Sequence, residues 1–435
     1  MRQSRKKWER KREEQRNKVI ALLFIVMMVI FCVVNIATAD RKFSAKENRA
    51  LEQRPKLTIS GIESGRWMKQ YESYVSDQFA GRDFWVALKS RIDLIAGKRK
   101  ANGVFKGKDH YLLEDIARPD EEQLKVNLDA MKKFQETYKN IPMYMMLVPN
   151  AANIESDKLP YCAVTEDQDK QFQKIKASLG TAFQWVNVED TLKKHRAEEI
   201  YYHTDHHWTT LGAYYGYQAL AAAMKLDTSK APAMKSYAVT NSFNGTLSAT
   251  SGYETDYNEP IYIYAPDDLK TAPQVVVNNV NEKKKTATLY DTSKLKEKDK
   301  YALFLGGNYP VLDIRTTADT TDRLLLVKDS YANSVIPFLT AYYREIIVVD
   351  PRYYYDDIRE VMKKNKITSV LFLYNGNTFV QDNSISGDCG WKDSSSRHES
   401  RRRTGGPCRK KSGQKQNGKN GPGSVQTCRD CLYRR

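Results

Sequence analysis

The sequence predicts an α/β fold, in which a mainly parallel sheet lies between layers of helices and is joined to one N-terminal transmembrane helix. Two observations carry this prediction. Short, continuous apolar runs alternate with segments of helical periodicity through the middle of the chain, which is the rhythm of βαβ units. Near the N-terminus, residues 19–39 form an apolar segment of the length that crosses a bilayer.

The N-terminal segment predicts a membrane topology. Residues 1–18 carry nine Lys and Arg against three Glu, and a short basic flank of this kind stays cytoplasmic. We therefore expect a cytoplasmic basic tail over 1–18, a single-pass helix in the cell membrane over 19–39, and an extracytoplasmic domain over 40–385. A cleaved signal peptide is the alternative, because Ala37-Thr38-Ala39 has the small-x-small form of a cleavage site.

Charge and cysteine content narrow the choice of partners. The formal net charge of the 435 residues is +17, but residues 1–18 contribute about +6 and residues 386–435 about +9. About +2 is left for the chain between them, so we expect no basic face and no nucleic-acid partner. Of the six cysteines, only Cys162 lies in the expected domain, so no internal disulfide holds that domain together.

The elements of the domain follow from periodicity and turn residues. A helical pattern over 67–96 is broken at Ala80-Gly81 and predicts two helices. The apolar run at 141–149 has the composition of a strand buried on both faces, as in a parallel sheet. The remaining predictions before the middle of the chain are a hairpin over 104–113, helices over 119–137 and 170–179, and a strand over 183–188.

The densest group of reactive side chains is Tyr201-Tyr202-His203-Thr204-Asp205-His206-His207-Trp208. A helical segment follows over 209–224, so the group lies on a loop that enters a helix, a common position for site residues. Asp205 and His207 are two positions apart, which in an extended segment puts both on one side and His206 on the other. A carboxylate beside an imidazole fixes its tautomer and stabilises the imidazolium, as a general base requires.

Two other interpretations fit the same loop. Histidine and carboxylate are ordinary zinc ligands, so His203, Asp205, His206 and His207 could form a metal site. Four ligands within five positions are poorly spaced for one tetrahedral ion, and no partner cluster occurs elsewhere, so we predict no metal. The other interpretation is structural, with the histidines hydrogen-bonded locally and Trp208 filling the core.

A serine late in the chain is the candidate nucleophile. Residues 323–327 are typical of a buried strand, Asp329 and Ser330 follow, and 331–343 has helical character. This order places the hydroxyl at the C-terminal edge of a parallel sheet, where a helix N-terminus supports a developing oxyanion. Serine needs an adjacent base, and His207 is the candidate. Taken alone, Ser330 would more simply cap its helix.

The block Asp205-His206-His207-Trp208 resembles the DHHW proteins of Gram-positive bacteria. These are similar to the AlgJ/AlgX-like alginate O-acetyltransferases, a branch of the SGNH hydrolase fold in which the Asp-x-His pair precedes the serine. The resemblance covers about residues 43–385, including Glu47-Asn48-Arg49 and Gly306-Gly307-Asn308. Lys328 departs from the SGNH pattern, which usually has glycine near that turn.

The resemblance implies an SGNH-hydrolase-like three-layer sandwich and a role for each site residue. Asp205 orients the base, His207 is the base and Ser330 is the nucleophile. Asn308 and Asn375 are the candidate oxyanion or substrate-binding residues, because SGNH enzymes use an asparagine there and because both follow apolar runs predicted to be strands. Each could equally be a turn residue.

The activity that the resemblance implies is O-acetylation of a cell-surface polysaccharide, with no cofactor. A multispanning membrane-bound O-acyltransferase is the implied partner that delivers acetyl groups across the bilayer. An esterase with the same triad and a catalytically silent glycan-binding or scaffold protein on the same fold are the alternatives.

Two regions lie outside the βαβ rhythm. Residues 237–297 are rich in Thr, Val, Asn and Tyr, with alternating stretches that predict a β-rich insertion. Residues 386–435 lack apolar runs and are strongly charged, which predicts a disordered basic tail. Their abrupt change of composition is also what a frameshifted end would produce.

Overall fold

A central sheet organises the computed structural model, which describes residues 2–386 except 45–48, 254, 256, 269 and 271. Within these residues the sheet has eight strands in the order β11-β10-β12-β14-β13-β15-β6-β7. The strands from β14 to β7 run parallel, and β12, β10 and β11 extend the sheet antiparallel at one edge. The parallel strands are β14 (Glu345–Val349), β13 (Arg323–Lys328), β15 (Ser369–Asn375), β6 (Met143–Val148) and β7 (Gln184–Trp185).

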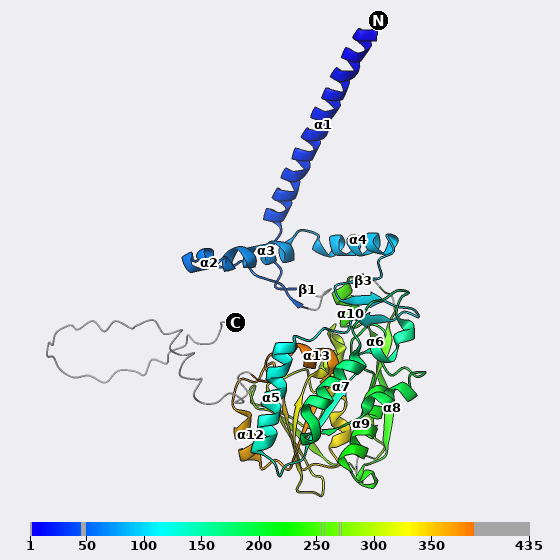
Figure 1. The fold of residues 1–435 in the computed structure, drawn as a ribbon, viewed down its shortest axis with the longest axis vertical. Helices are drawn as coiled ribbons and strands as arrows, with labels where there is room; N and C mark the ends of the chain where they lie inside the picture. Colours follow the sequence, from blue (N-terminus) through cyan, green and yellow to red (C-terminus); the bar gives the residue numbers. More distant parts are fainter. Residues whose placement is uncertain are drawn as a thin grey trace, which may run out of the picture. The chain divides into compact units, whose positions relative to one another are not determined.

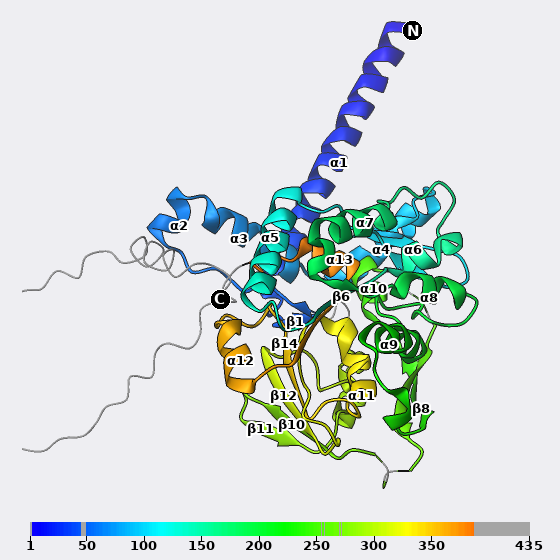
Figure 2. The same ribbon diagram turned by 60° about the horizontal axis from the view of Figure 1, so that its bottom comes forward.

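Helices cover both faces of the sheet, so the predicted layered α/β sandwich is confirmed (Figures 1 and 2). Alternate residues of each strand enter two separate cores, as the period of a strand dictates. Leu324 and Leu326 of β13 pack in one core, and Leu325 and Val327 in the other. The first core takes side chains from α6 (Ala151–Ile154), α8 (Val188–Lys194), α9 (Thr210–Met224) and α11 (Ile336–Leu339). The second takes them from α5 (Glu121–Thr137), α7 (Gln168–Leu179), α12 (Ile358–Asn365) and α13 (Gly376–Gln381).

The β-rich region divides between two sheets. The strands β8 (Met234–Phe243) and β9 (Glu259–Pro266) pair as an antiparallel ribbon of their own. The strands β10 (Val275–Asn279) and β11 (Lys284–Thr286) instead join the central sheet through β12 (Val311–Thr316). The region therefore supplies both the ribbon and the antiparallel edge of the main sheet.

The N-terminal region holds one helix that is long and apolar enough to cross a membrane, α1 (Arg2–Ala37). Three shorter helices follow it, two of them separated at the break predicted near Gly81, and they run across the C-terminal end of α1 (Figure 1). A small sheet then leads toward the loop that holds His203, His206 and His207. These elements are α2 (Ile59–Glu63), α3 (Arg66–Gln78), α4 (Arg82–Ile95), β3 (Lys100–Ala101), β4 (Val104–Lys106) and β5 (Leu112–Glu114).

Two local predictions are wrong. The helix expected over 331–343 is a 3₁₀ turn, η6 (Ser330–Ser334), followed by the single turn of α11. Pro337 lies in the first turn of α11, where its missing N–H costs nothing, and it cannot continue a helix from η6. The strand expected before Asn308 is the 3₁₀ turn η5 (Lys300–Leu303). The tail expected beyond residue 386 lies outside the described residues.

Candidate active site

The loop that holds the three histidines is closed at its base by backbone pairing. Tyr201 and Trp208 form an isolated antiparallel bridge, and Tyr202 N donates to His207 O at 3.2 Å. Thr209 then caps α9, because its hydroxyl accepts from Gly212 N at 3.2 Å. The loop is therefore held at both ends against the start of a core helix.

Asp205, His207 and Ser330 form a continuous chain of hydrogen bonds. Asp205 Oδ1 lies 2.6 Å from His207 Nδ1, and His207 Nε2 lies 2.8 Å from Ser330 Oγ. A carboxylate on Nδ1 makes that nitrogen the proton donor and leaves Nε2 to accept from the serine hydroxyl. The geometry thus joins two stretches that are 123 positions apart in the sequence.

The carboxylate of Asp205 is fully satisfied by neighbours. Its Oδ1 also accepts from His207 N at 3.0 Å, and its Oδ2 accepts from Thr246 N and Oγ1, both at 2.8 Å. Burial raises the pKa of Asp205, but the neighbouring rings of His206 and His207 and the hydrogen bonds outweigh it and lower the pKa far below the usual value. Asp205 is therefore a permanent anion that holds one orientation of the imidazole.

Thr246 reaches Asp205 because a glycine precedes it. A Cβ at Gly245 would collide with the Asp205 Cβ, so no other residue allows this close approach without displacing the loop. Thr246 begins α10 (Thr246–Ser251), which thus lies directly against the carboxylate.

A buried glutamate, Glu259, holds the backbone of the histidine loop by hydrogen bonds. Glu259 on β9 accepts from His203 N and Thr204 N at 2.8 Å and from Thr204 Oγ1 at 2.6 Å. Burial raises the pKa of Glu259 to about 7, although these hydrogen bonds act to lower it. The ribbon β8–β9 therefore has a structural role at the site, which no pattern near Asp205 in the sequence indicates.

The turn that presents Ser330 is fastened by the preceding aspartate. Asp329 Oδ1 accepts from Tyr331 N at 2.9 Å, and its Oδ2 accepts from Asn375 N at 2.8 Å. The turn is thereby tied to the C-terminal end of the neighbouring strand β15. Asp329 is completely buried, so its function in this geometry is to hold the turn.

Trp208 joins the histidine loop to the serine turn. Its indole N–H donates to Tyr331 O at 3.1 Å and to Ser334 Oγ at 3.0 Å, and the ring is completely buried. The ring of Tyr301 stacks on the ring of His207 at a centroid distance of 3.7 Å. Its hydroxyl donates to the same Ser334 Oγ at 3.1 Å. The base is thus clamped between its aspartate and an aromatic face.

The two predicted asparagines lie beside the serine turn in different ways. The side-chain nitrogen of Asn375 donates to Val148 O at 3.3 Å and to Asn150 Oδ1 at 3.2 Å, and its Oδ1 caps α13. Asn308 uses its Oδ1, which accepts from Lys328 Nζ at 2.7 Å and from Asn333 Nδ2 at 3.1 Å.

The unusual lysine before the serine is buried among these groups. Lys328 Nζ also lies 3.4 Å from Asp350 Oδ2, which Arg352 pairs at 2.7 Å. Burial lowers the pKa of Lys328 to about 8, although Asp350 acts to raise it. Lys328 and Asn308 therefore form one polar network beneath the turn.

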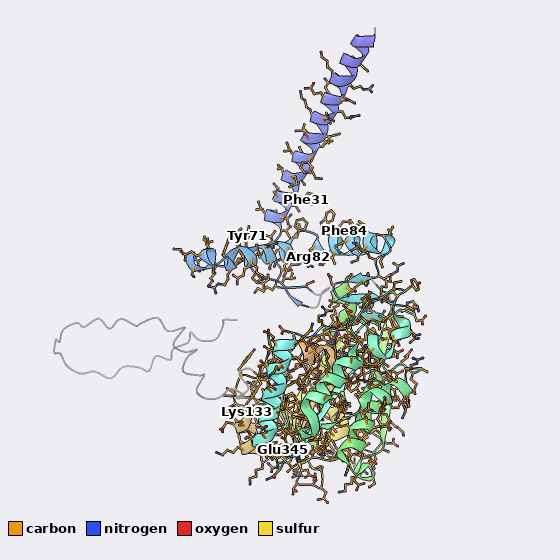
Figure 3. All side chains as sticks on the ribbon, in the orientation of Figure 1. Phe31, Tyr71, Arg82, Phe84, Lys133 and Glu345 are labelled. Atoms are coloured by element: carbon orange, nitrogen blue, oxygen red, sulfur yellow. The ribbon has the colours of Figure 1, made fainter. Side chains whose placement is uncertain are left out.

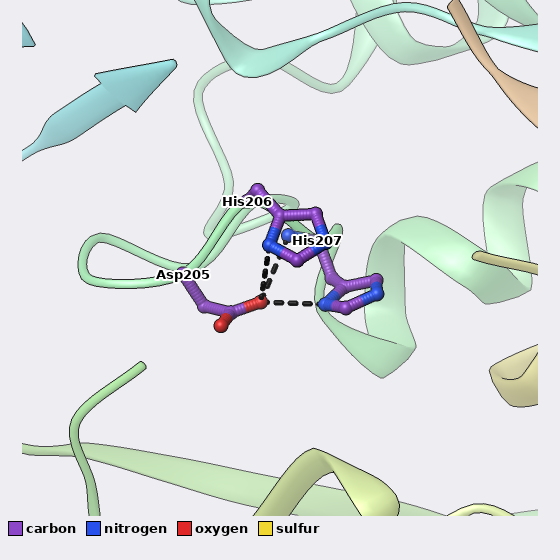
Figure 4. A group of neighbouring side chains, drawn as sticks. All are labelled: Asp205, His206 and His207. Atoms are coloured by element: carbon purple, nitrogen blue, oxygen red, sulfur yellow. Dashed lines mark hydrogen bonds and ion pairs between the residues drawn. The ribbon is translucent and has the colours of Figure 1, made fainter. Parts of the chain in front are cut away.

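His206 does not point away from His207, as the extended spacing predicted. The two ring centroids are 3.9 Å apart, and His206 Nδ1 lies 3.7 Å from Asp205 Oδ1 (Figure 4). The reason is that Asp205 Oδ1 accepts from His207 N, which bends the backbone into a turn.

This bend brings three ligand-type side chains together. The candidate ligand atoms of Asp205, His206 and His207 lie within 4.8 Å of one another. Hydrogen bonds engage three of the four ring nitrogens, since His206 Nδ1 is 2.7 Å from Thr246 Oγ1 and both nitrogens of His207 have partners. His203 faces elsewhere and stacks on Tyr111 at 3.8 Å.

A cavity of about 410 Å³ opens beside His206 and Thr246, which neighbour the triad. Glu114, Asn377 and Asn102 also line it. Glu114 Oε2 accepts from Asn150 Nδ2 at 2.8 Å and from Asn377 Nδ2 at 3.0 Å, and burial raises its pKa. A larger cavity of about 1170 Å³ is lined by Tyr214, Tyr264 and Phe338, and neither cavity is lined by Asp205, His207 or Ser330 themselves.

Comparison with known proteins identifies the family and the fold. The family described as "DHHW protein" matches residues 109–349, more than half of the chain. A DHHW family protein from Eubacterium siraeum superposes with a TM-score of 0.56 at 23% identity, covering 66% of this chain and 95% of that one. Bacillus cereus PatB1 superposes with a TM-score of 0.54 at 21% identity, covering 64% of this chain and 98% of that one.

Two further results complete the comparison. The O-acetyltransferase domain of Pseudomonas putida AlgJ also aligns, with a TM-score of 0.41 at 14% identity over 65% of this chain and 94% of that one. The curated protein sequences contain no match. Because the matched region holds both Asp205-His206-His207-Trp208 and Ser330, the chain belongs to the DHHW protein family.

Proposed function

We propose that the protein is a membrane-anchored, extracytoplasmic O-acetyltransferase that acetylates a cell-surface polysaccharide through Ser330, His207 and Asp205. The observation that carries the proposal is the unbroken chain of hydrogen bonds, 2.6 Å from Asp205 to His207 and 2.8 Å from His207 to Ser330. A serine hydroxyl at this distance from an oriented imidazole can be deprotonated as it attacks a carbonyl.

The first half of the reaction loads the serine. Ser330 Oγ attacks the carbonyl carbon of an acetyl donor, and His207 Nε2 takes the hydroxyl proton. The bond to the donor's leaving group then breaks, and His207 returns that proton to the departing atom. Asp205 stabilises the imidazolium throughout, because its carboxylate stays ionised and hydrogen-bonded to Nδ1.

The second half repeats these steps with a sugar. A glycan hydroxyl attacks the acetyl-serine ester, His207 accepts its proton, and the Ser330 oxygen leaves with that proton. The cavity beside His206 and Thr246 is where we place the acceptor sugar, since the carboxyl group of Glu114 and the amide group of Asn377 are among the groups that line it. The steps use only these side chains and the two substrates.

Asn308 is the oxyanion donor that we favour among the two predicted asparagines. The side-chain amide nitrogen of Asn375 donates hydrogen bonds to Val148 and Asn150. In Asn308 it is the side-chain oxygen that is engaged, as the acceptor from Lys328 and Asn333. We therefore favour the side-chain amide nitrogen of Asn308 as the donor to a developing oxyanion, because its oxygen, and not its nitrogen, makes these contacts.

The same proposal includes the cellular setting. With the basic flank cytoplasmic and α1 across the cell membrane, the site faces the outside, where no soluble acetyl donor is expected. A multispanning O-acyltransferase that carries acetyl groups across the bilayer is the partner that this arrangement requires.

Acetyl transfer tests the proposal directly. The full chain in detergent, given p-nitrophenyl acetate and a cell-wall polysaccharide, should release nitrophenol and form acetylated glycan. Ser330→Ala and His207→Ala should each reduce the rate by about a thousandfold or more. Ser229→Ala, at an exposed serine away from the site, is the matched control and should leave the rate unchanged.

The other outcomes have definite meanings. Acetate release with no glycan product would make the protein an esterase with the same triad. Equal rates in the wild type and Ser330→Ala would remove the catalytic assignment and leave a glycan-binding or scaffold protein.

A further inference from the structure

Two helices between α1 and the catalytic loop region expose a band of large apolar side chains. On α3 these are Met68, Tyr71 and Val75, and on α4 they are Phe84, Ile92 and Ile95; we call these six residues the α3–α4 stripe. Phe84 is 62% exposed and Ile95 is 87% exposed. The spacings of three, four and eight residues put each set on one face of its helix. Exposed apolar side chains gathered in this way mark an interaction site.

The opposite face of α4 packs on the catalytic body. Ala87 and Ser90 are buried, and Ser90 Oγ donates to Ser251 O at 3.4 Å. The backbone at Gly252 approaches Val86 so closely that a Cβ there would lie 2.8 Å from Val86 Cγ1. The stripe on α4 is therefore not a misplaced core face, because the helix already has its core contacts.

The turn between α3 and α4, which separates the two halves of the stripe, contacts the C-terminal part of α1. Asn35 Oδ1 accepts from Ala80 N at 2.9 Å, at the turn that joins α3 and α4. The ring of Phe31 lies 6.3 Å from that of Phe79 and 6.0 Å from that of Trp85. Figure 3 shows Phe31, Tyr71 and Phe84 grouped where α1 meets the two helices.

We propose that the α3–α4 stripe inserts into the interfacial layer of the membrane that α1 crosses, on the side that faces the catalytic body. An amphipathic helix with a broad apolar face lies in the plane of a bilayer surface and buries that face among the upper acyl chains. Aromatic side chains such as Trp85 and Tyr71 are enriched at that depth. The inference rests on α1 spanning the membrane, as proposed above.

The contacts on the other face of α4 connect this helix to the candidate active site through α10. Ser251 ends α10, whose first residue, Thr246, holds the Asp205 carboxylate. Asn102 Nδ2 also donates to Thr250 O at 2.9 Å and lines the cavity beside His206. A helix lying on the bilayer would therefore hold the triad and this cavity close to the membrane surface.

Tryptophan quenching in vesicles tests the proposal on the full chain. The protein would be reconstituted in phosphatidylcholine vesicles that contain lipids brominated either near the headgroup or near the chain ends. We expect bromine near the headgroup to quench strongly, and Trp85→Phe to remove a measurable part of that quenching. Trp185→Phe, at the central sheet, is the control and should leave the quenching unchanged.

A second variant and a vesicle flotation assay distinguish failure of the stripe proposal from failure of the proposal that α1 spans the membrane. Ile92→Glu with Ile95→Glu changes only exposed side chains, so the fold should persist while the Trp85 quenching disappears. If the chain floats with the vesicles but Trp85 is not quenched, the stripe is covered by another protein or a second copy, and the inference is overturned. If the chain does not float at all, the proposal that fails is the membrane-spanning α1.

Discussion

At the scale of single residues, Glu259 links stability to pH at the catalytic loop. Burial raises its pKa to about 7, so the folded state binds this proton more tightly than the unfolded chain. The group therefore contributes stability that is complete below the unfolded pKa, near 4.5, and is lost as the pH rises through about 7.

A neutral replacement should remove this pH dependence. Between pH 4.5 and 7.5 the free energy of unfolding of the wild type should fall, relative to Glu259→Gln, by about 3 kcal/mol. Urea unfolding of the full chain in detergent, followed by near-ultraviolet circular dichroism, measures this difference. The control is Glu282→Gln at an exposed glutamate, which should keep the wild-type slope, and equal slopes for Glu259→Gln would contradict the role of Glu259.

Asn308 allows a second residue-scale prediction. In Asn308→Asp an oxygen remains to accept from Lys328 and Asn333, but the amide donor is lost. The rate of acyl transfer should fall by roughly a hundredfold with little change in substrate affinity, because an oxyanion donor acts mainly in the transition state. Steady-state kinetics separates kcat from KM. A change confined to KM would assign Asn308 to substrate binding instead.

At the scale of elements, Trp208 is the contact that holds the histidine loop to the serine turn. Trp208→Phe keeps an aromatic side chain, although a smaller one, and removes the donor to Tyr331 O and Ser334 Oγ, leaving buried acceptors less satisfied. We expect a stability loss of about 1–3 kcal/mol and a slower reaction of Ser330. Thermal unfolding and the rate of serine labelling would be compared with those of Trp185→Phe. A full labelling rate in Trp208→Phe would mean that the turn holds its position alone.

The elements also show how far the sequence alone predicts this structure. The strand β13, its turn and Ser330 follow from an apolar run and a polar break, which are local signals. The break between α3 and α4 was likewise predicted, because Gly81 interrupts a helical period. The orientation of His206 was not predicted. It depends on a turn in which the Asp205 side chain accepts a hydrogen bond from the backbone N–H of His207, two residues later.

Contacts between distant segments account for the rest. Glu259 lies more than fifty positions from the loop that it supports, and nothing near either segment indicates the pairing. Asn375 has the expected position at the end of β15, but its side chain serves as a helix cap. The prediction of a strand before Asn308 was wrong because a short apolar run fits a 3₁₀ turn equally well.

At the scale of the whole molecule, the topology of the membrane segment has a direct test. Protease added to intact cells that express the full chain with an N-terminal tag should digest the body. The tag and α1 should survive as a small membrane-bound fragment if the basic flank is cytoplasmic, as we propose. A protected body would reverse the orientation, and a soluble mature chain beginning near Asp40 would replace the anchor with a cleaved signal peptide.

The most direct test of the central claim is covalent capture of the serine. Activated serines react with sulfonyl fluorides, so the full chain would be treated with such a reagent and the modified residue located by peptide mass spectrometry.

A single adduct on Ser330, formed far more slowly in His207→Ala and Asp205→Asn, is the result that we predict. Modification of many exposed hydroxyls at equal rates, with Ser330 no faster than the others and no effect of either variant, would contradict the triad.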